Sequence, residues 1–241
     1  MNKELLKKIS YTALLAVAAA MGAAKALGDF YFKQQLNQQV IKFSPSLSAH
    51  YETASIDFLL QGVIENLALQ LPETEKLTAQ KVTIKDLYRF VGQSFPEHWQ
   101  LNAENLHYPF SNDLFIRANL QFQLQKKADQ QFLSSTLQSE EWGIFQLQTT
   151  LKGQDPAQLQ IVALEIDYKV GRIWRQLVSQ LNGWFYQVES LPFPKEIKTP
   201  LLTFLKQPKN FKLILRPSSP LSPLKMISTP PEQWGLSVSF S

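Results

Sequence analysis

Three histidines, His50, His98 and His107, are the residues of this 241-residue chain best suited to metal or acid–base chemistry. None of them stands in an H-x-H or H-x-x-x-H pair, so their spacing matches no metal motif. The sequence has no cysteine, which excludes disulfides, a thiol nucleophile and Cys-ligated zinc. It also lacks G-x-S-x-G, a P-loop and G-x-G-x-x-G. We therefore expect no enzymatic activity, no metal and no cofactor.

Two groups of charged residues could also suggest a catalytic site. The carboxylate pair Glu140–Glu141 falls in a predicted turn, where we interpret it as solvated. Asp167, Lys169 and Arg172 flank a predicted strand–helix junction, where capping or ion pairing explains them. A hydrolase with an unrecognised site stays open as a third function.

The apolar segment Ile9–Leu27 determines where the rest of the chain folds. It approaches the roughly 20 residues of a membrane span, and Lys3, Lys7 and Lys8 precede it. By the positive-inside rule, these lysines keep the N-terminus in the cytoplasm. We expect an uncleaved signal anchor in the inner membrane. The anchor positions are Ile9, Leu14, Leu15, Val17, Met21 and Leu27.

The alternative is a cleaved signal peptide, for which Ala24-Lys25-Ala26 provides a formal cleavage site. The chain would then be soluble in the periplasm. Phe30–Lys33 instead resembles an aromatic belt at a membrane interface and favours the anchor. The net charge of +4 is mild and lies partly in the N-terminal tail, so we expect no nucleic-acid partner.

The pattern of apolar residues divides the chain into residues 1–28, 29–46 and 47–241. The first is the cytoplasmic tail and transmembrane helix. In the second, Phe32, Leu36, Val40 and Phe43 form one helical stripe, which predicts a stalk. The third is a periplasmic domain in which apolar and polar residues mostly alternate.

This alternation predicts ten antiparallel strands, of which Leu114–Gln125 is the most regular. The ten are Tyr51–Leu59, Val63–Leu71, Leu77–Ile84, Leu101–Tyr108, Leu114–Gln125, Phe132–Gln138, Ile144–Lys152, Leu159–Lys169, Phe211–Leu215 and Leu236–Phe240. Helices are expected after Asp86, from Ile173 to Leu181, and after an N-cap at Thr199 with Pro200 at N1. The fold class is α+β, mainly antiparallel β, as an elongated curved sheet with a few covering helices.

The segment HYETASIDFLLQGVIENLALQL resembles the first hairpin of AsmA-like and related anchored periplasmic envelope proteins. The matching positions are Tyr51, Ile56, Leu59, Leu60, Gly62, Val63, Asn66 and Leu67. LTAQKVTIKDL, at Leu77–Leu87, resembles the strand that follows in these families, and the chain departs from their pattern at Asp167–Gly171. The resemblance implies a curved sheet with a dry concave face that handles envelope lipids, and it implies no catalytic residues.

We expect the dry face to bind lipid acyl chains, since an apolar sheet face must be covered by helices, a partner or a ligand. The candidate lipid-binding residues are Leu67, Leu69, Leu71, Leu114, Ile116, Leu120, Phe122 and Leu124. The ligand would be a phospholipid or lipopolysaccharide. The alternative is a scaffold or assembly factor for an envelope protein complex, in which the predicted helices cover the face.

Overall fold

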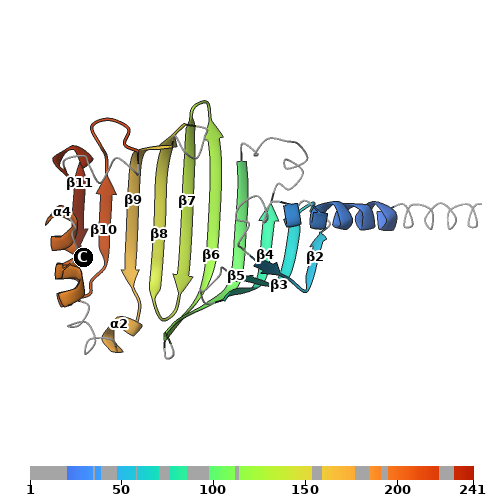
Figure 1. Ribbon diagram of the computed structural model, residues 1–241, viewed down its shortest axis with the longest axis horizontal. Helices are drawn as coiled ribbons and strands as arrows, with labels where there is room; N and C mark the ends of the chain where they lie inside the picture. Colours follow the sequence, from blue (N-terminus) through green and yellow to red (C-terminus); the bar gives the residue numbers. More distant parts are fainter. Residues whose placement is uncertain are drawn as a thin grey trace, which may run out of the picture.

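The computed structural model of the chain describes residues 21–34, 36–38, 48–57, 59–70, 76–85, 98–111, 114–153, 159–176, 185–190, 195–222 and 231–241. Within these ranges the chain forms one antiparallel sheet of eleven strands, drawn in Figure 1 as a single broad layer with helices at both ends. The strands are β1 (Ser48–His50), β2 (Thr53–Ile56), β3 (Gly62–Gln70), β4 (Leu77–Lys85), β5 (His98–Ser111), β6 (Leu114–Lys127), β7 (Gln130–Ser139), β8 (Gly143–Lys152), β9 (Gln160–Val170), β10 (Phe211–Leu215) and β11 (Leu236–Phe240). The prediction of a mainly antiparallel α+β fold is confirmed.

The strand order follows the sequence. β1 and β2 both pair with β3, and from β3 to β11 each strand pairs with the next. Between β9 and β10 the chain leaves the sheet to form α2 (Ile173–Gln176), a helical segment at residues 185–190, and α4 (Lys195–Lys206). A 3-10 helix, η4 (Pro231–Trp234), precedes β11. Such a meander brings strands that are adjacent in sequence together, so local turns set most of the pairing.

The alternation predicted for β6 is present along the strand. Its even-numbered residues face one side, where Ala118 and Leu124 are buried, and its odd-numbered residues from Phe115 to Gln125 are exposed. One face of the sheet is therefore apolar and the other polar. We call them the apolar face and the polar face.

Two strands, β3 and β5, change the phase of this alternation at the same level of the sheet. Ile64 and Leu67 of β3 both pack in the N-terminal core, although they are three residues apart. Asn66 lies between them with a φ of 52°, and Asn105 of β5 has a φ of 50° beside a register shift from Ala103 to Leu106. Asparagine tolerates this left-handed conformation better than most residues. Each such residue lets the strand return its next apolar side chain to the same face.

Three helix predictions can be compared with the structure or with its described ranges. The predicted start of the last helix at Thr199 is wrong, because α4 begins at Lys195 and contains Pro200. Pro200 removes the hydrogen bond that would reach the carbonyl of Glu196, and its ring crowds that carbonyl, yet the helix continues to Lys206. The predicted helix at Ile173 does begin there as α2, but its continuation and the helix predicted after Asp86 lie outside the described residues.

Candidate functional site: the apolar face of the sheet

The residues with the most reactive side chains do not converge. His50 lies in β1, and His98 and His107 lie in β5 nine residues apart. Among the described residues, no three His, Asp or Glu side chains are close enough to hold a metal ion. Glu140 and Glu141 occupy a turn, and Arg172 forms ion pairs with them at 3.7 and 3.2 Å.

These ion pairs perturb one of the two carboxylates. Partial burial by itself would raise the pKa of Glu141, but hydrogen bonding, including that from the Arg172 guanidinium, outweighs it. The pKa therefore lies below its ordinary value of 4.5. A carboxylate held ionised by an arginine is a poor general acid or base near neutral pH. The ion pairs of Arg172 with Glu140 and Glu141 join the end of β9 to the β7–β8 turn.

The register of the strands aligns apolar residues across the sheet as well as along it. One line of directly paired residues, here called the central row, runs from β3 to β11. Its members are Ile64, Val82, Ala103, Leu120, Leu137, Phe145, Tyr168, Phe211 and Phe240. At roughly 4.8 Å per strand, the row is about 38 Å long. Tyr168 is its only polar member.

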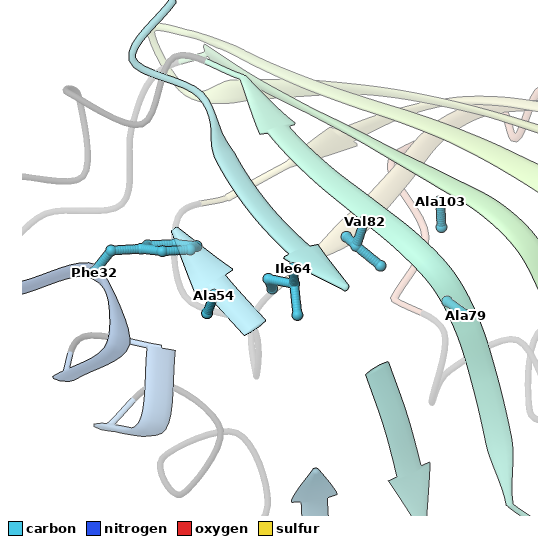
Figure 2. Close-up of a cluster of buried hydrophobic side chains, with 6 residues drawn as sticks. All are labelled: Phe32, Ala54, Ile64, Ala79, Val82 and Ala103. Carbon is cyan, nitrogen blue, oxygen red and sulfur yellow. The ribbon is translucent and has the colours of Figure 1, made fainter. Parts of the chain in front are cut away.

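The N-terminal end of the central row is covered by the helix at residues 21–34 and 36–38. Phe32 on this helix is 5% exposed and belongs to one buried cluster with Ile64 and Val82, whose members Figure 2 shows. Leu36, one turn later, packs against the same cluster. Two members of the predicted stalk stripe are therefore core residues of the sheet domain, and the stripe's Val40 and Phe43 lie outside the described residues. The predicted aromatic belt required Phe32 to lie at a membrane interface, but its side chain is buried in this core.

The C-terminal end of the row is covered by α4. Phe204 and Leu205 of this helix are buried against β9, β10 and β11. The Phe204 ring makes edge contacts with Tyr168 and Phe211, with ring centres 6.0 and 5.4 Å apart. Trp174 of α2 packs on Phe204 at 4.9 Å.

Tyr168 enters this apolar cluster with its hydroxyl satisfied. The hydroxyl donates a hydrogen bond to the carbonyl oxygen of Trp142 and accepts one from Trp174 Nε1 at 2.6 Å. Burial raises the pKa of the Tyr168 hydroxyl above its ordinary value of 10.0, although hydrogen bonding from Trp174 and from the backbone of Gly171 opposes this shift. The hydroxyl is therefore neutral at physiological pH, and its hydrogen bonds join α2 to the β7–β8 turn.

The middle of the apolar face differs from its ends. Leu137, Phe145, Leu147 and Ile166 lie on this face in β7, β8 and β9, and all are half-buried. Within the part of the chain that the structure describes, none of them belongs to the clusters that the two helical ends form with the sheet. We call this stretch of half-buried apolar residues the central face.

The structure distributes the predicted lipid-binding residues over two regions of the apolar face. Leu67 and Leu69 lie on β3, where they pair with Ala79 and Leu77 near the N-terminal edge. The β6 residues Ile116, Leu120, Phe122 and Leu124 lie on the same face, three strands further along, and Leu114 is the first residue of β6. Leu120 packs against the N-terminal core and Leu124 is buried. Leu71 lies outside the described residues.

The residues of the central face were missed because the alternation of β7, β8 and β9 does not reveal their register. The pairs Leu120–Leu137, Leu137–Phe145 and Phe145–Tyr168 become visible only when the strands are aligned. A signal was available in the tight turns at Ala128–Asp129 and Glu140–Trp142, which fix the register of two hairpins.

The polar face carries a shallow hollow of about 270 Å³. Gln123, Ser134, Gln148 and Glu165 line it from four successive strands. Glu165 of β9 forms an ion pair with Lys212 Nζ of the neighbouring strand β10 at 2.6 Å. Amide and hydroxyl groups in this arrangement are typical of a hydrated sheet surface.

Most of the predicted membrane anchor lies outside the described residues, including Ile9, Leu14, Leu15 and Val17. Met21 and Leu27 lie on the N-terminal helix and are 57% and 70% exposed. No helix in the described ranges is both long enough and apolar enough to cross a membrane.

Comparison of the sequence with protein-family models and with curated proteins finds no match.

Proposed function

We propose that this chain is a membrane-anchored envelope protein without enzymatic activity, and that the central face of its sheet binds lipid acyl chains. The observation that carries the proposal is the continuous apolar row across nine strands, with helices packed on its two ends. Large apolar side chains each favour burial by about 1.5–3 kcal/mol. A ligand with hydrocarbon chains would supply that burial between the helices.

The anchored placement belongs to the same proposal. The segment Ile9–Leu27 would hold the chain in the inner membrane and leave the sheet in the periplasm, where acyl chains are within reach. The resemblance of Tyr51–Leu87 to AsmA-like envelope proteins supports this placement, because such proteins combine an anchor with a lipid-handling sheet.

A second candidate function is a scaffold for an envelope complex. It is favoured by the half-buried state of Leu137, Phe145, Leu147 and Ile166, none of which is fully exposed. A face that is already covered from within the chain would have this degree of exposure. The protein would then present its outer surfaces to partners, and the apolar face would be an ordinary core.

Site-specific photo-crosslinking separates the two functions. A benzoylphenylalanine replaces Phe145 on the apolar face, and in a matched protein it replaces Phe132 on the polar face, where that ring is 38% exposed. After irradiation of the full chain in its membrane, adducts are identified by mass spectrometry. Lipid binding predicts lipid adducts at position 145 and few at position 132. Adducts at 145 that join only segments of the same chain would refute lipid binding and support the scaffold.

A further inference from the structure

An exposed pair of leucines forms the tip of the β2–β3 hairpin. Leu59 is 75% exposed and Leu60 is 58% exposed, among the highest values for large apolar residues in the described chain. Asp57 holds this tip in shape. Its carboxylate accepts hydrogen bonds from the backbone N–H groups of Leu59 and Gln61, both at 2.9 Å, and its carbonyl accepts one from Leu60 at 3.1 Å. These bonds join Leu59, Leu60 and Gln61 to Asp57, and the side chains of both leucines are exposed.

The backbone of this tip is unfavourable for the residue it carries. Leu60 has a φ of 58°, in the left-handed region that glycine or asparagine usually occupies in turns. A leucine there makes the turn harder to form, and its exposed side chain contributes little to the core. A strained conformation at an exposed position points to a role outside folding.

The tip lies beside the helix that leads to the predicted anchor. The backbone N–H of Ile56, at the end of β2, donates a hydrogen bond to Asp29 Oδ1 at 2.6 Å. Asp29 is also bonded to Lys25 Nζ at 2.9 Å, one turn nearer the N-terminus. Figure 1 shows β2 ending against this blue helix, which projects beyond the sheet along the long axis of the molecule.

The same part of the helix exposes apolar side chains of its own. Leu27 is 70% exposed, Phe30 69% and Tyr31 42%, and they lie within two residues of Asp29. Lys25 and Lys33 flank them along the helix. Apolar and aromatic side chains bordered by lysines are typical of the membrane–water interface, where the lysines meet lipid phosphates.

We propose that Leu59 and Leu60 insert into the lipid bilayer next to the anchor, as a second membrane contact of the sheet domain. The inference rests on the anchored placement proposed above, since the helix must carry the tip to the level of the headgroups. Two contacts on different elements, joined by the Asp29–Ile56 hydrogen bond, fix the orientation of the sheet relative to the membrane. A helix alone would leave it free to rotate and tilt.

Single-cysteine labelling tests this contact directly, because the chain has no cysteine of its own. Leu59→Cys and Leu60→Cys are made separately in the full chain and labelled with an environment-sensitive fluorophore. Ser237→Cys, on the exposed side of β11 at the far edge of the sheet, is the control. Met21→Cys reports on the anchor. The proteins are placed in vesicles of phosphatidylethanolamine and phosphatidylglycerol that contain a spin-labelled lipid as quencher.

We expect the labels at positions 59 and 60 to emit at shorter wavelength and to be quenched several-fold more than the label at 237. The label at position 59 is a second measurement, because replacing Leu60 also changes a residue with a left-handed backbone and can alter the turn. If the position 21 label is quenched while both tip labels behave like position 237, the second contact is refuted and the anchored placement stands. If position 21 is not quenched either, the anchored placement fails and the inference fails with it.

Discussion

Replacing Phe32 by alanine tests whether the N-terminal helix is part of the sheet domain. Phe32 is 5% exposed and packs with Ala54, Ile64 and Val82. Removing a buried phenylalanine side chain usually costs about 3–5 kcal/mol, depending on how far the site collapses. The helix lies at one end of the sheet and can shift toward it, so we expect a loss near the lower limit, about 3 kcal/mol.

Phe30→Ala is the matched control. Phe30 lies two residues earlier on the same helix and is 69% exposed, so its truncation should change stability by no more than about 0.5 kcal/mol. Both changes replace phenylalanine by alanine in a helix, and the gain in helix propensity therefore cancels in the comparison.

The measurement is urea unfolding of the full chain in detergent micelles, followed by the fluorescence of its five tryptophans. With a denaturant slope of about 2 kcal/mol per molar, a 3 kcal/mol loss lowers the unfolding midpoint by roughly 1.5 M. Equal midpoints for the Phe32 and Phe30 variants would show that the helix is not docked on the sheet. The sheet domain would then be independent of the segment before residue 48.

Four further substitutions test the backbone and one charge. Gly28→Ala should stabilise the protein by up to about 1 kcal/mol, because Gly28 is helical and an added Cβ would make an ordinary contact with Ile56 at 3.4 Å. Gly143→Ala should instead cost more than about 2 kcal/mol, because the φ of Gly143 is 103° and a Cβ would lie 2.0 Å from the carbonyl oxygen of Lys169. The urea unfolding midpoints of the two variants check both signs. Leu60→Gly should raise stability by up to about 1 kcal/mol by relieving the left-handed strain, and an unfolding midpoint at or below that of the unchanged protein would contradict this. Partial burial raises the pKa of Asp29, but the hydrogen bond from the Ile56 backbone and the ion pair with Lys25 more than offset this, so the folded-state pKa lies below 3.8. The stability that the ionised Asp29 contributes is therefore present above pH 3.8 and is lost as the pH falls through the folded-state pKa. Asp29→Asn should lose less stability on acidification than the unchanged protein, and an equal loss of stability in both proteins would contradict this.

The strands could be predicted from the sequence because an antiparallel sheet with one apolar face has a period of two. β6 was predicted as Leu114–Gln125 and runs to Lys127, and β10 and β11 have the predicted bounds. Where the period breaks, residue type alone does not give the face. Ile64 and Leu67 share a face only because Asn66 between them adopts a positive φ, which depends on the whole row of neighbouring strands.

Helix boundaries and the site were less predictable for the same reason. Thr199-Pro200 has the composition of a helix start, but the packing of Phe204 and Leu205 on the sheet favours a longer helix, and tertiary contacts outweigh a local signal worth about 1 kcal/mol. The central face depends on pairs such as Leu137–Phe145, whose members lie on different strands. Such pairs follow from register, which the turns determine and the alternation does not.

The side chains of the N-terminal helix lie in two different environments. Phe32 and Leu36, four residues apart, face the core of the sheet, while Leu27, Phe30 and Tyr31 remain exposed on its other sides. A domain truncated after Phe32 would lose a buried core residue and would not test the sheet as it exists in the whole chain. Because the helix is docked through Phe32 and tied to β2 through Asp29, a force or tilt applied at its N-terminal end reaches the sheet directly. The orientation of the apolar face relative to this helix is therefore built into the fold.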